Sequence, residues 1–261
     1  MTSSRGVFAI GDGPPLVLVP GVQGRWEWMW PAVEALAAWF RVITYSLAGD
    51  RSSGLPVPGA GAFDRHVDQL ERVMDHFGVT KATICGVSYG GLIAVRTAAT
   101  RPSRVENLVL VSTPAPTWRP DERLQRYATS PRASTPGFVL GAPGRLWCEI
   151  GAARPGYRDR SVAVASYLAR VCRYPASPMA MAGRVRCLAG HDFVPDARAV
   201  ARPTLIVTGE PALDRVVPVA GTRQYLDLIP QAVGWTLDRT GHIGLITRPE
   251  AFAAALKSFV K

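Results

Sequence analysis

The stretch "TICGVSYGGLIAV", residues 83–95, contains the junction on which the predicted fold and function both depend. A β-branched apolar run leads into a Gly-x-Ser-x-Gly turn centred on Ser88, and small, helix-compatible residues follow. In a strand–turn–helix setting, the glycines of such a turn let the serine adopt a strained backbone conformation that presents its hydroxyl. The alternative is that Ser88 only caps the helix that follows. A base, an acid and backbone N–H donors elsewhere in the chain would favour a nucleophile.

Strand-like apolar runs alternate with helical patterns on both sides of this turn. The expected strands lie at residues 15–21, 41–47, 83–85, 105–113, 202–210 and 233–238. The expected helices lie at residues 31–40, 62–78, about 89–99 and 249–260, and one more ends at residue 225. Near-continuous apolar strands that alternate with helices predict an α/β fold, with a mostly parallel central sheet flanked by helices.

The alternation stops in the middle of the chain. From about residue 114 to 201 the sequence is rich in Pro, Arg and Ala, and it shows helical patches without a clear strand. We therefore expect a core domain made of residues 1–115 and 202–261, with a helical cap at residues 116–201 inserted over one edge of the sheet.

Composition limits the classes of partner. The chain has 261 residues, is 48% hydrophobic and carries a net charge of +10, mostly from arginines spread along the sequence. It contains no basic run or nucleic-acid motif, so we expect no nucleic-acid partner. It also contains no apolar run near the roughly 20 residues of a membrane helix, and no signal-peptide pattern. We expect a cytoplasmic protein that acts on a small molecule, with its four cysteines as free structural thiols and no metal site.

One histidine has a position that suits a general base. His242 lies in "DRTGHIGL", residues 238–245, in a loop just after the last expected strand. The carboxyl ends of parallel strands share one edge of a sheet, so this loop opens on the same edge as the Ser88 turn. Of the other histidines, His66 and His76 lie on an amphipathic helix, where we expect them to face solvent or cap its end, and His191 lies near the end of the insertion.

The acid that would orient this histidine is sought in the loop after the next-to-last strand. "LIVTGEPALDRVVP", residues 205–218, offers Glu210 and Asp214 at the same sheet edge. Asp214 is the preferred candidate and Glu210 the alternative, whereas Asp238 is interpreted as a turn residue. The order serine, acid, histidine along the chain is one of those known for serine hydrolases.

A glycine loop could supply the oxyanion hole. "VPGVQGRW", residues 19–26, follows the first strand of the parallel run, so its backbone N–H groups could face a substrate carbonyl beside the N–H of Tyr89. An ordinary turn would also explain these glycines.

These segments together resemble the α/β-hydrolase family over nearly the whole chain. The resemblance rests on "PLVLVPGVQG" (residues 15–24), "GVSYGG" (86–91), "RPTLIVTGEPALDRVVP" (202–218) and "TGHIG" (240–244). It implies a mostly parallel sheet of about eight strands with a helical cap. It also implies roles for particular residues: nucleophile Ser88, orienting acid Asp214, general base and acid His242, and oxyanion-hole N–H groups of Val22 and Tyr89.

The chain departs from the family pattern in two places. Pro20 precedes Gly21 where family members usually have a histidine that braces the oxyanion loop, and Ser46 stands where many members carry an aspartate. Neither departure removes a residue of the expected triad.

The expected function is a serine hydrolase of carboxylic esters, lactones or thioesters that needs no cofactor. Within enzymes, two alternatives are a carbon–carbon hydrolase and an aminopeptidase-like enzyme, for which Glu149 or Asp159 of the cap would hold a free amine. From another class, a non-catalytic small-molecule receptor on the same fold is the alternative. Trp26 and Trp28 could line an apolar substrate pocket, or pack in the core.

Overall fold

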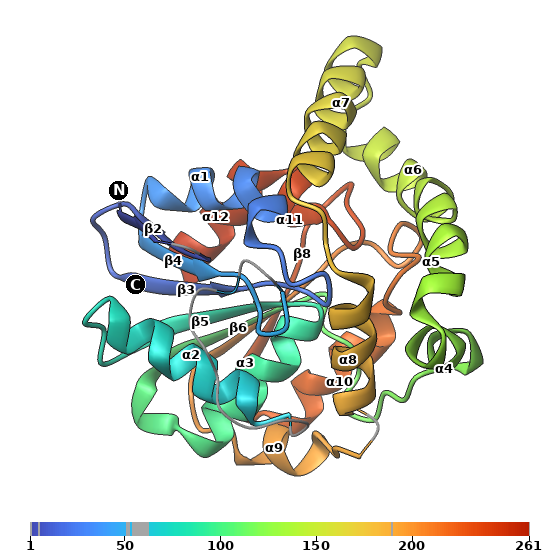
Figure 1. Ribbon diagram of the computed structural model, residues 1–261. Helices are drawn as coiled ribbons and strands as arrows, with labels where there is room; N and C mark the ends of the chain where they lie inside the picture. The colour runs from blue at the N-terminus through green and yellow to red at the C-terminus, as the bar shows by residue number, and fades with distance from the viewer. Residues whose placement is uncertain (1, 5, 51–52, 54–62, 189, 261) are drawn as a thin grey trace.

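The central element of the fold is one twisted, mostly parallel sheet (Figure 1). The structure is a computed structural model that describes residues 2–4, 6–50, 53, 63–188 and 190–260. In these ranges eight strands pair in the order β1-β2-β4-β3-β5-β6-β7-β8. The strands are β1 (Thr2–Ser4), β2 (Val7–Ile10), β3 (Pro15–Val19), β4 (Arg41–Tyr45), β5 (Ala82–Val87), β6 (Val105–Val111), β7 (Thr204–Thr208) and β8 (Ala232–Thr236).

The strand directions follow the expected pattern from β4 onward. β4, β3, β5, β6, β7 and β8 pair in parallel, whereas β1 and β2 are antiparallel to their neighbours. The predicted α/β fold with a mostly parallel sheet is confirmed. The two antiparallel strands were not predicted, because β1 is a polar three-residue strand and β2 spans only four residues.

Helices cover both faces of the sheet (Figure 1). One face packs against α2 (Arg65–His76), α3 (Tyr89–Thr100), α9 (Val194–Ala199) and α10 (Val219–Leu228). The other face packs against α1 (Trp30–Ala37), α11 (Gly244–Thr247) and α12 (Pro249–Phe259). Two single 3₁₀ turns are η1 (Trp26–Met29) and η2 (Pro102–Arg104).

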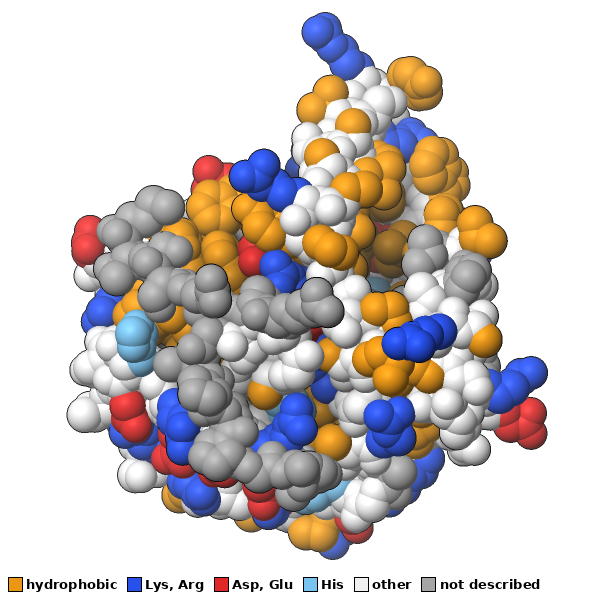
Figure 2. Space-filling model, in the orientation of Figure 1, with side chains coloured by type: hydrophobic (Ala, Val, Ile, Leu, Met, Phe, Trp, Pro, Cys, Tyr) orange, Lys and Arg blue, Asp and Glu red, His pale blue; other side chains and the backbone are white. Residues whose placement is uncertain are grey.

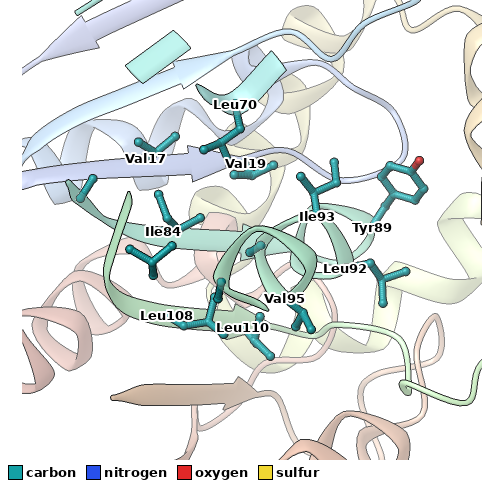
Figure 3. Packing of buried hydrophobic residues seen from close by; sticks show 14 of the residues in the cluster. Val17, Val19, Leu70, Ile84, Tyr89, Leu92, Ile93, Val95, Leu108 and Leu110 are labelled. Atoms are coloured by element: carbon teal, nitrogen blue, oxygen red, sulfur yellow. The ribbon is translucent and has the colours of Figure 1, made fainter. Parts of the chain in front are cut away.

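Strand β5 shows how sequence alternation builds the two cores. Ile84 packs with the α2–α3 side, whereas Cys85 and Val87 pack with the α1–α12 side. Figure 3 shows the first of these clusters, with side chains of β3, β5 and β6 packed against Leu92, Ile93 and Val95 of α3. Because successive side chains of a strand point to opposite faces, an uninterrupted apolar run serves both layers. Burial also raises the pKa of the Cys85 thiol, as expected for a structural cysteine.

The segment between β6 and β7 is helical throughout its regular elements. It forms α4 (Glu122–Thr129), α5 (Pro131–Leu140), α6 (Ala142–Ala153), α7 (Tyr157–Arg173) and α8 (Pro178–Leu188) before α9. Helices α4, α5, α6 and α8 lie to one side of the sheet, and α7 extends away from the body of the molecule (Figure 1). Hydrophobic side chains gather on the exposed surface of α6 and α7 (Figure 2), whereas α9 packs against α3 of the core. None of the helices in the described ranges has both the length and the apolar composition to span a bilayer.

The expectation that His66 faces solvent or caps a helix is wrong. Its side chain is fully buried, and its ring lies 6.0 Å from that of Phe63 and 5.6 Å from that of Tyr89. Neither ring nitrogen has a hydrogen-bond partner among the described residues. Burial, and then the charges of Arg184 and Arg65, lower the pKa of His66 to about 3, so the ring is neutral. His66 therefore belongs to the packing of α2 against α3.

Truncation of a central strand residue tests this packing. We expect Ile84→Ala to lower the free energy of unfolding by about 2–5 kcal/mol, because Ile84 is fully buried and the deletion leaves a cavity. Val162→Ala, on the exposed surface of α7, should change it by no more than about 0.5 kcal/mol. Urea unfolding measures both, and equal losses would contradict the assignment of the core.

Candidate active site

Ser88 lies at the turn between β5 and α3 in a strained conformation. Its φ of 53° and ψ of −119° are unusual for a residue with a side chain, and such strain costs on the order of 1–3 kcal/mol. Two 2.8 Å hydrogen bonds hold it, from Ser88 N–H to the Val111 carbonyl and from Gly91 N–H to the Ser88 carbonyl. The Ser88 side chain makes no cap hydrogen bond to α3, so helix capping does not explain the serine.

The two glycines of the turn are required by close backbone contacts. A Cβ atom on Gly86 would lie 2.3 Å from the Gly90 carbonyl oxygen. A Cβ atom on Gly90 would lie 2.4 Å from the carbonyl oxygen of Val19 and 2.6 Å from that of Pro20. No side chain can approach a backbone atom this closely, so the first glycine is required by contact within the elbow and the second by packing of the elbow against the end of β3.

The loop after β3 lies directly beside Ser88. A Cβ atom on Gly21 would be 3.6 Å from the Ser88 Cβ, and Gly24 N–H closes the turn with a 2.9 Å bond to the Gly21 carbonyl. Within the described turns and loops, the N–H groups of Val22 and Tyr89 donate no backbone hydrogen bond. Tyr89 is also the first residue of α3, where backbone N–H groups lack intrahelical partners and favour negative charge.

Arg184 of α8 braces this loop. Its buried guanidinium donates to the Val22 carbonyl at 2.9 Å and to the carbonyls of Leu47 and Ala48 at 3.1 Å. It also forms a buried ion pair with Asp50. The family usually places a bracing histidine on the oxyanion loop, and in this chain an arginine distant in sequence contacts the same loop. No local pattern in the sequence singles out Arg184.

Asp214 and His242 lie together on the loops that follow β7 and β8. The Asp214 Oδ2 atom is 3.4 Å from His242 Nδ1, while Oδ1 accepts hydrogen bonds from Val216 N–H at 3.0 Å and Val217 N–H at 2.9 Å. Burial by itself would raise the pKa of Asp214. The hydrogen bond and charge of His242, together with the two backbone donors, outweigh burial and lower that pKa. Asp214 is therefore a buried carboxylate held toward the imidazole.

The two loops approach each other closely enough to exclude a side chain. A Cβ atom on Gly241 would lie 2.5 Å from the Leu213 carbonyl oxygen, so the backbone beside His242 packs against the backbone beside Asp214. The alternative acid, Glu210, is engaged elsewhere, since its Oε1 accepts a 2.6 Å hydrogen bond from Arg239 N–H. Because β3, β5, β7 and β8 all belong to the parallel part of the sheet, the four loops share its carboxyl edge.

A carboxylate of α6 also contacts the loop that carries His242. Glu149 of α6 is fully buried, and both of its oxygens accept a hydrogen bond from Ile243 N–H, at 3.0 and 3.1 Å. Burial raises the pKa of Glu149 to about 7, although hydrogen bonds from the backbone of Gly241 and Ile243 and the charge of His242 act in the opposite direction. The Glu149 carboxylate thus binds the backbone next to His242 and does not form a separate site for an amine.

The two candidate pocket tryptophans differ in their surroundings. Trp26 stacks on Phe8 with ring centroids 4.6 Å apart, and it packs against the core on the α1–α12 side. This environment corresponds to the core alternative for Trp26. Trp28 donates from its ring nitrogen to the Tyr174 carbonyl at 2.8 Å and packs edge-on against Tyr167 of α7. Trp28 therefore lies at the junction of the core and the cap.

His191 has partners of its own. Its Nε2 lies 2.7 Å from the Asp196 carboxylate, and its ring packs against Phe63 and Phe193. In the part of the chain that the structure describes, no group of three or more His, Cys, Asp or Glu side chains could hold a metal ion.

The parallel sheet, the strained serine elbow and the shared loop edge define a protein of the α/β-hydrolase fold. A sequence model described as "alpha/beta hydrolase fold" matches residues 14–136, and the sheet topology of the chain agrees with this fold. The protein named "Putative carbamate hydrolase RutD" from Caulobacter sp. strain K31 is 27% identical over 262 residues, which cover 95% of this chain and 91% of that protein.

Solved structures agree with this placement. A thermophilic esterase from Thermogutta terrifontis has a TM-score of 0.79 at 26% identity, covering 97% of this chain and 92% of that chain. The enol-lactonase from Burkholderia xenovorans LB400 has a TM-score of 0.79 at 24% identity, covering 97% and 95%, a likeness that shows the fold. Together these similarities support a hydrolase built on this fold.

Loss of the arginine brace should be costly. We expect Arg184→Met to lower the free energy of unfolding by about 3–5 kcal/mol, because it leaves Asp50 buried without its partner. Arg186→Met is the matched control on the same helix, since Arg186 is exposed and donates to the Ala128 carbonyl, and it should cost about 1 kcal/mol or less. Chemical denaturation distinguishes the two, and a loss below 1 kcal/mol for Arg184→Met would show that the brace is not structural.

The buried carboxylate makes stability depend on pH. Because the folded-state pKa of Glu149, about 7, lies above the ordinary 4.5, its contribution to stability is complete below pH 4.5 and is lost as the pH rises through 7. The Glu149→Gln variant cannot ionise at this position, so its stability does not decrease in this way as the pH rises. We expect the stability of the variant relative to the unmodified protein to rise by about 3 kcal/mol between pH 4.5 and pH 7.5. Urea unfolding at both pH values tests this, and a pH-independent difference would contradict the burial of an ionising carboxyl.

Proposed function

We propose that this chain is a serine hydrolase that cleaves a carboxylic ester, including cyclic esters and thioesters, through an acyl-enzyme on Ser88. The observation that carries the proposal is the strained Ser88 elbow at the same sheet edge as a buried Asp214–His242 pair. A residue held at positive φ is costly to maintain, and together with an adjacent carboxylate–imidazole pair it is typical of an activated nucleophile.

In the proposed reaction the Ser88 hydroxyl attacks the substrate carbonyl carbon while His242 accepts its proton. Asp214 holds the Nδ1 side of the imidazole and stabilises the positive charge that the ring gains. The tetrahedral intermediate collapses as His242 returns the proton to the departing alcohol. A water molecule then repeats the sequence on the acyl-enzyme, and it releases the acid and the free serine.

The negative oxygen of each intermediate needs donors that are already in place. The N–H groups of Val22 and Tyr89 are proposed for this, since each lies next to Ser88 or the loop beside it and donates no backbone hydrogen bond within the described turns and loops. Arg184 supports the Val22 peptide by binding its carbonyl oxygen, which fixes the plane of the loop. The proline that replaces the usual histidine of this loop is compatible with such an arrangement.

The relatives suggest the substrate class. An esterase and an enol-lactonase share the fold, and the Caulobacter relative is named as a carbamate hydrolase. All three names describe cleavage at an acyl carbon by transfer to water. Carbamates are therefore the second candidate substrate for the same Ser88 chemistry, and they are favoured by the similarity that covers 95% of the chain.

Hydrolysis of p-nitrophenyl acetate, butyrate and octanoate tests the proposal. We expect the unmodified protein to turn over at least one of these esters, and Ser88→Ala and His242→Ala to lose on the order of 10⁴ in kcat. Ser103→Ala and His76→Ala remove the same groups from exposed positions and should retain full activity. Activity that survives in Ser88→Ala would contradict a serine nucleophile. An inactive unmodified protein would exclude these simple esters and direct the assay to carbamates.

A further inference from the structure

The environment of Glu149 is unusual for a carboxylate. Of the twelve residues of α6, all of them described, Glu149 is the buried one, and its relative exposure is 0%. Among the described residues no lysine or arginine forms an ion pair with it. A buried carboxyl without a cationic partner is costly when ionised, and it is retained only where backbone donors or a nearby positive charge offset the cost.

The groups that offset this cost belong to the histidine loop. Ile243 N–H donates to both carboxylate oxygens. Ile243 directly follows His242, whose charge favours the ionised form of Glu149. The carboxylate of α6 therefore holds the main chain next to the imidazole.

The charged and titratable groups around Glu149 come from few elements. His242 and Asp214 act on it from the core loops, and α11 carries no titratable side chain between Gly244 and Thr247. On α5 the titratable residue is Arg132, which is exposed. On α7, Arg160 lies near the end of α6 but donates to the carbonyls of Arg154 and Pro155. Charge at Glu149 is thus felt mainly by the Asp214–His242 pair.

We propose that Glu149 is a positioning residue that the cap supplies to the site: it fixes the loop carrying His242 and, as a carboxylate, stabilises the imidazolium formed during the reaction. This inference rests on the proposed function, because it assigns Glu149 a part in the same serine chemistry. Asp214 lies at Nδ1 and holds the ring directly. Glu149 acts through the backbone and through its charge, so that the base depends on a residue outside the core domain.

The loop that carries His242 connects α6 with the core. Glu149 belongs to α6, which contacts α11 just after His242, whereas Asp214 belongs to the core. The loop that carries His242 is therefore contacted by the core through Asp214 and by α6 through Glu149.

The test compares Glu149→Gln with the unmodified protein at two pH values. Glutamine keeps an acceptor for Ile243 N–H but cannot ionise, so it matches the protonated form of Glu149. We expect the variant to lose roughly three- to tenfold in kcat/KM for the ester at pH 8, where Glu149 is charged. At pH 6, where Glu149 is mostly protonated, the two proteins should agree within about twofold. If the role of Glu149 were purely structural, the ratio of kcat/KM between the variant and the unmodified protein would be the same at both pH values.

Three controls make the result decisive. Glu122→Gln removes the same charge from an exposed position of α4. Its kcat/KM should be close to that of the unmodified protein at both pH values. Glu149→Asp keeps the charge, so it should retain the rise in activity between pH 6 and pH 8, although at a lower kcat. Thermal unfolding establishes that each variant is folded at both pH values. A pH-independent ratio for Glu149→Gln, or the loss of the rise in Glu149→Asp, would overturn the charge role.

A readout without catalysis separates this inference from the proposed function. Glu149→Ala removes both hydrogen bonds to the loop, so we expect faster amide hydrogen exchange at residues 240–244, with the strands of the sheet unchanged. If the unmodified protein cleaves no ester, the proposed function fails, and this exchange still decides the positioning role. Unchanged exchange at residues 240–244 would overturn it, whatever the activity.

Discussion

The constraint on which the site depends is the close contact between the Ser88 elbow and the end of β3. The Gly90 backbone packs against the carbonyls of Val19 and Pro20 with no room for a Cβ atom, and Ser88 adopts a positive φ at the same turn. This contact sets the serine beside the glycine loop that follows β3. The energy that maintains the strain comes from the apolar packing of β3, β5 and α3, which buries these elements almost completely.

Two buried charged residues of the helical segment between β6 and β7 contact the loops of the sheet edge. Arg184 of α8 binds carbonyls on the loops after β3 and β4, and Glu149 of α6 binds the Ile243 N–H group on the loop after β8. The arginine therefore supplies donors to main-chain acceptors, and the glutamate supplies acceptors to a main-chain donor. Because loops are held by their backbone groups, α6 and α8 contribute to the conformation of the loops at this edge.

Much of the fold follows from local sequence, and the contacts between distant residues do not. Uninterrupted apolar runs such as residues 105–113 identify parallel strands, and the strand directions then place the loops of Ser88, Asp214 and His242 on one edge. The expected exposure of His66 is wrong, because a 3.6-residue period cannot reveal that Phe63 and Tyr89 of α3 cover that side of α2. Arg184 and Glu149 contact loops more than 90 residues away in sequence, a relation that no periodicity encodes.

The central claim is that Ser88 is an activated nucleophile, and covalent capture tests it most directly. The protein is incubated with a fluorophosphonate, and its intact mass is measured together with that of Ser88→Ala and Ser103→Ala. We expect one adduct per chain in the unmodified protein and in Ser103→Ala, located at Ser88 by peptide mapping, and no adduct in Ser88→Ala. A folded protein that forms no adduct, or an adduct that persists in Ser88→Ala, would contradict the assignment of the nucleophile.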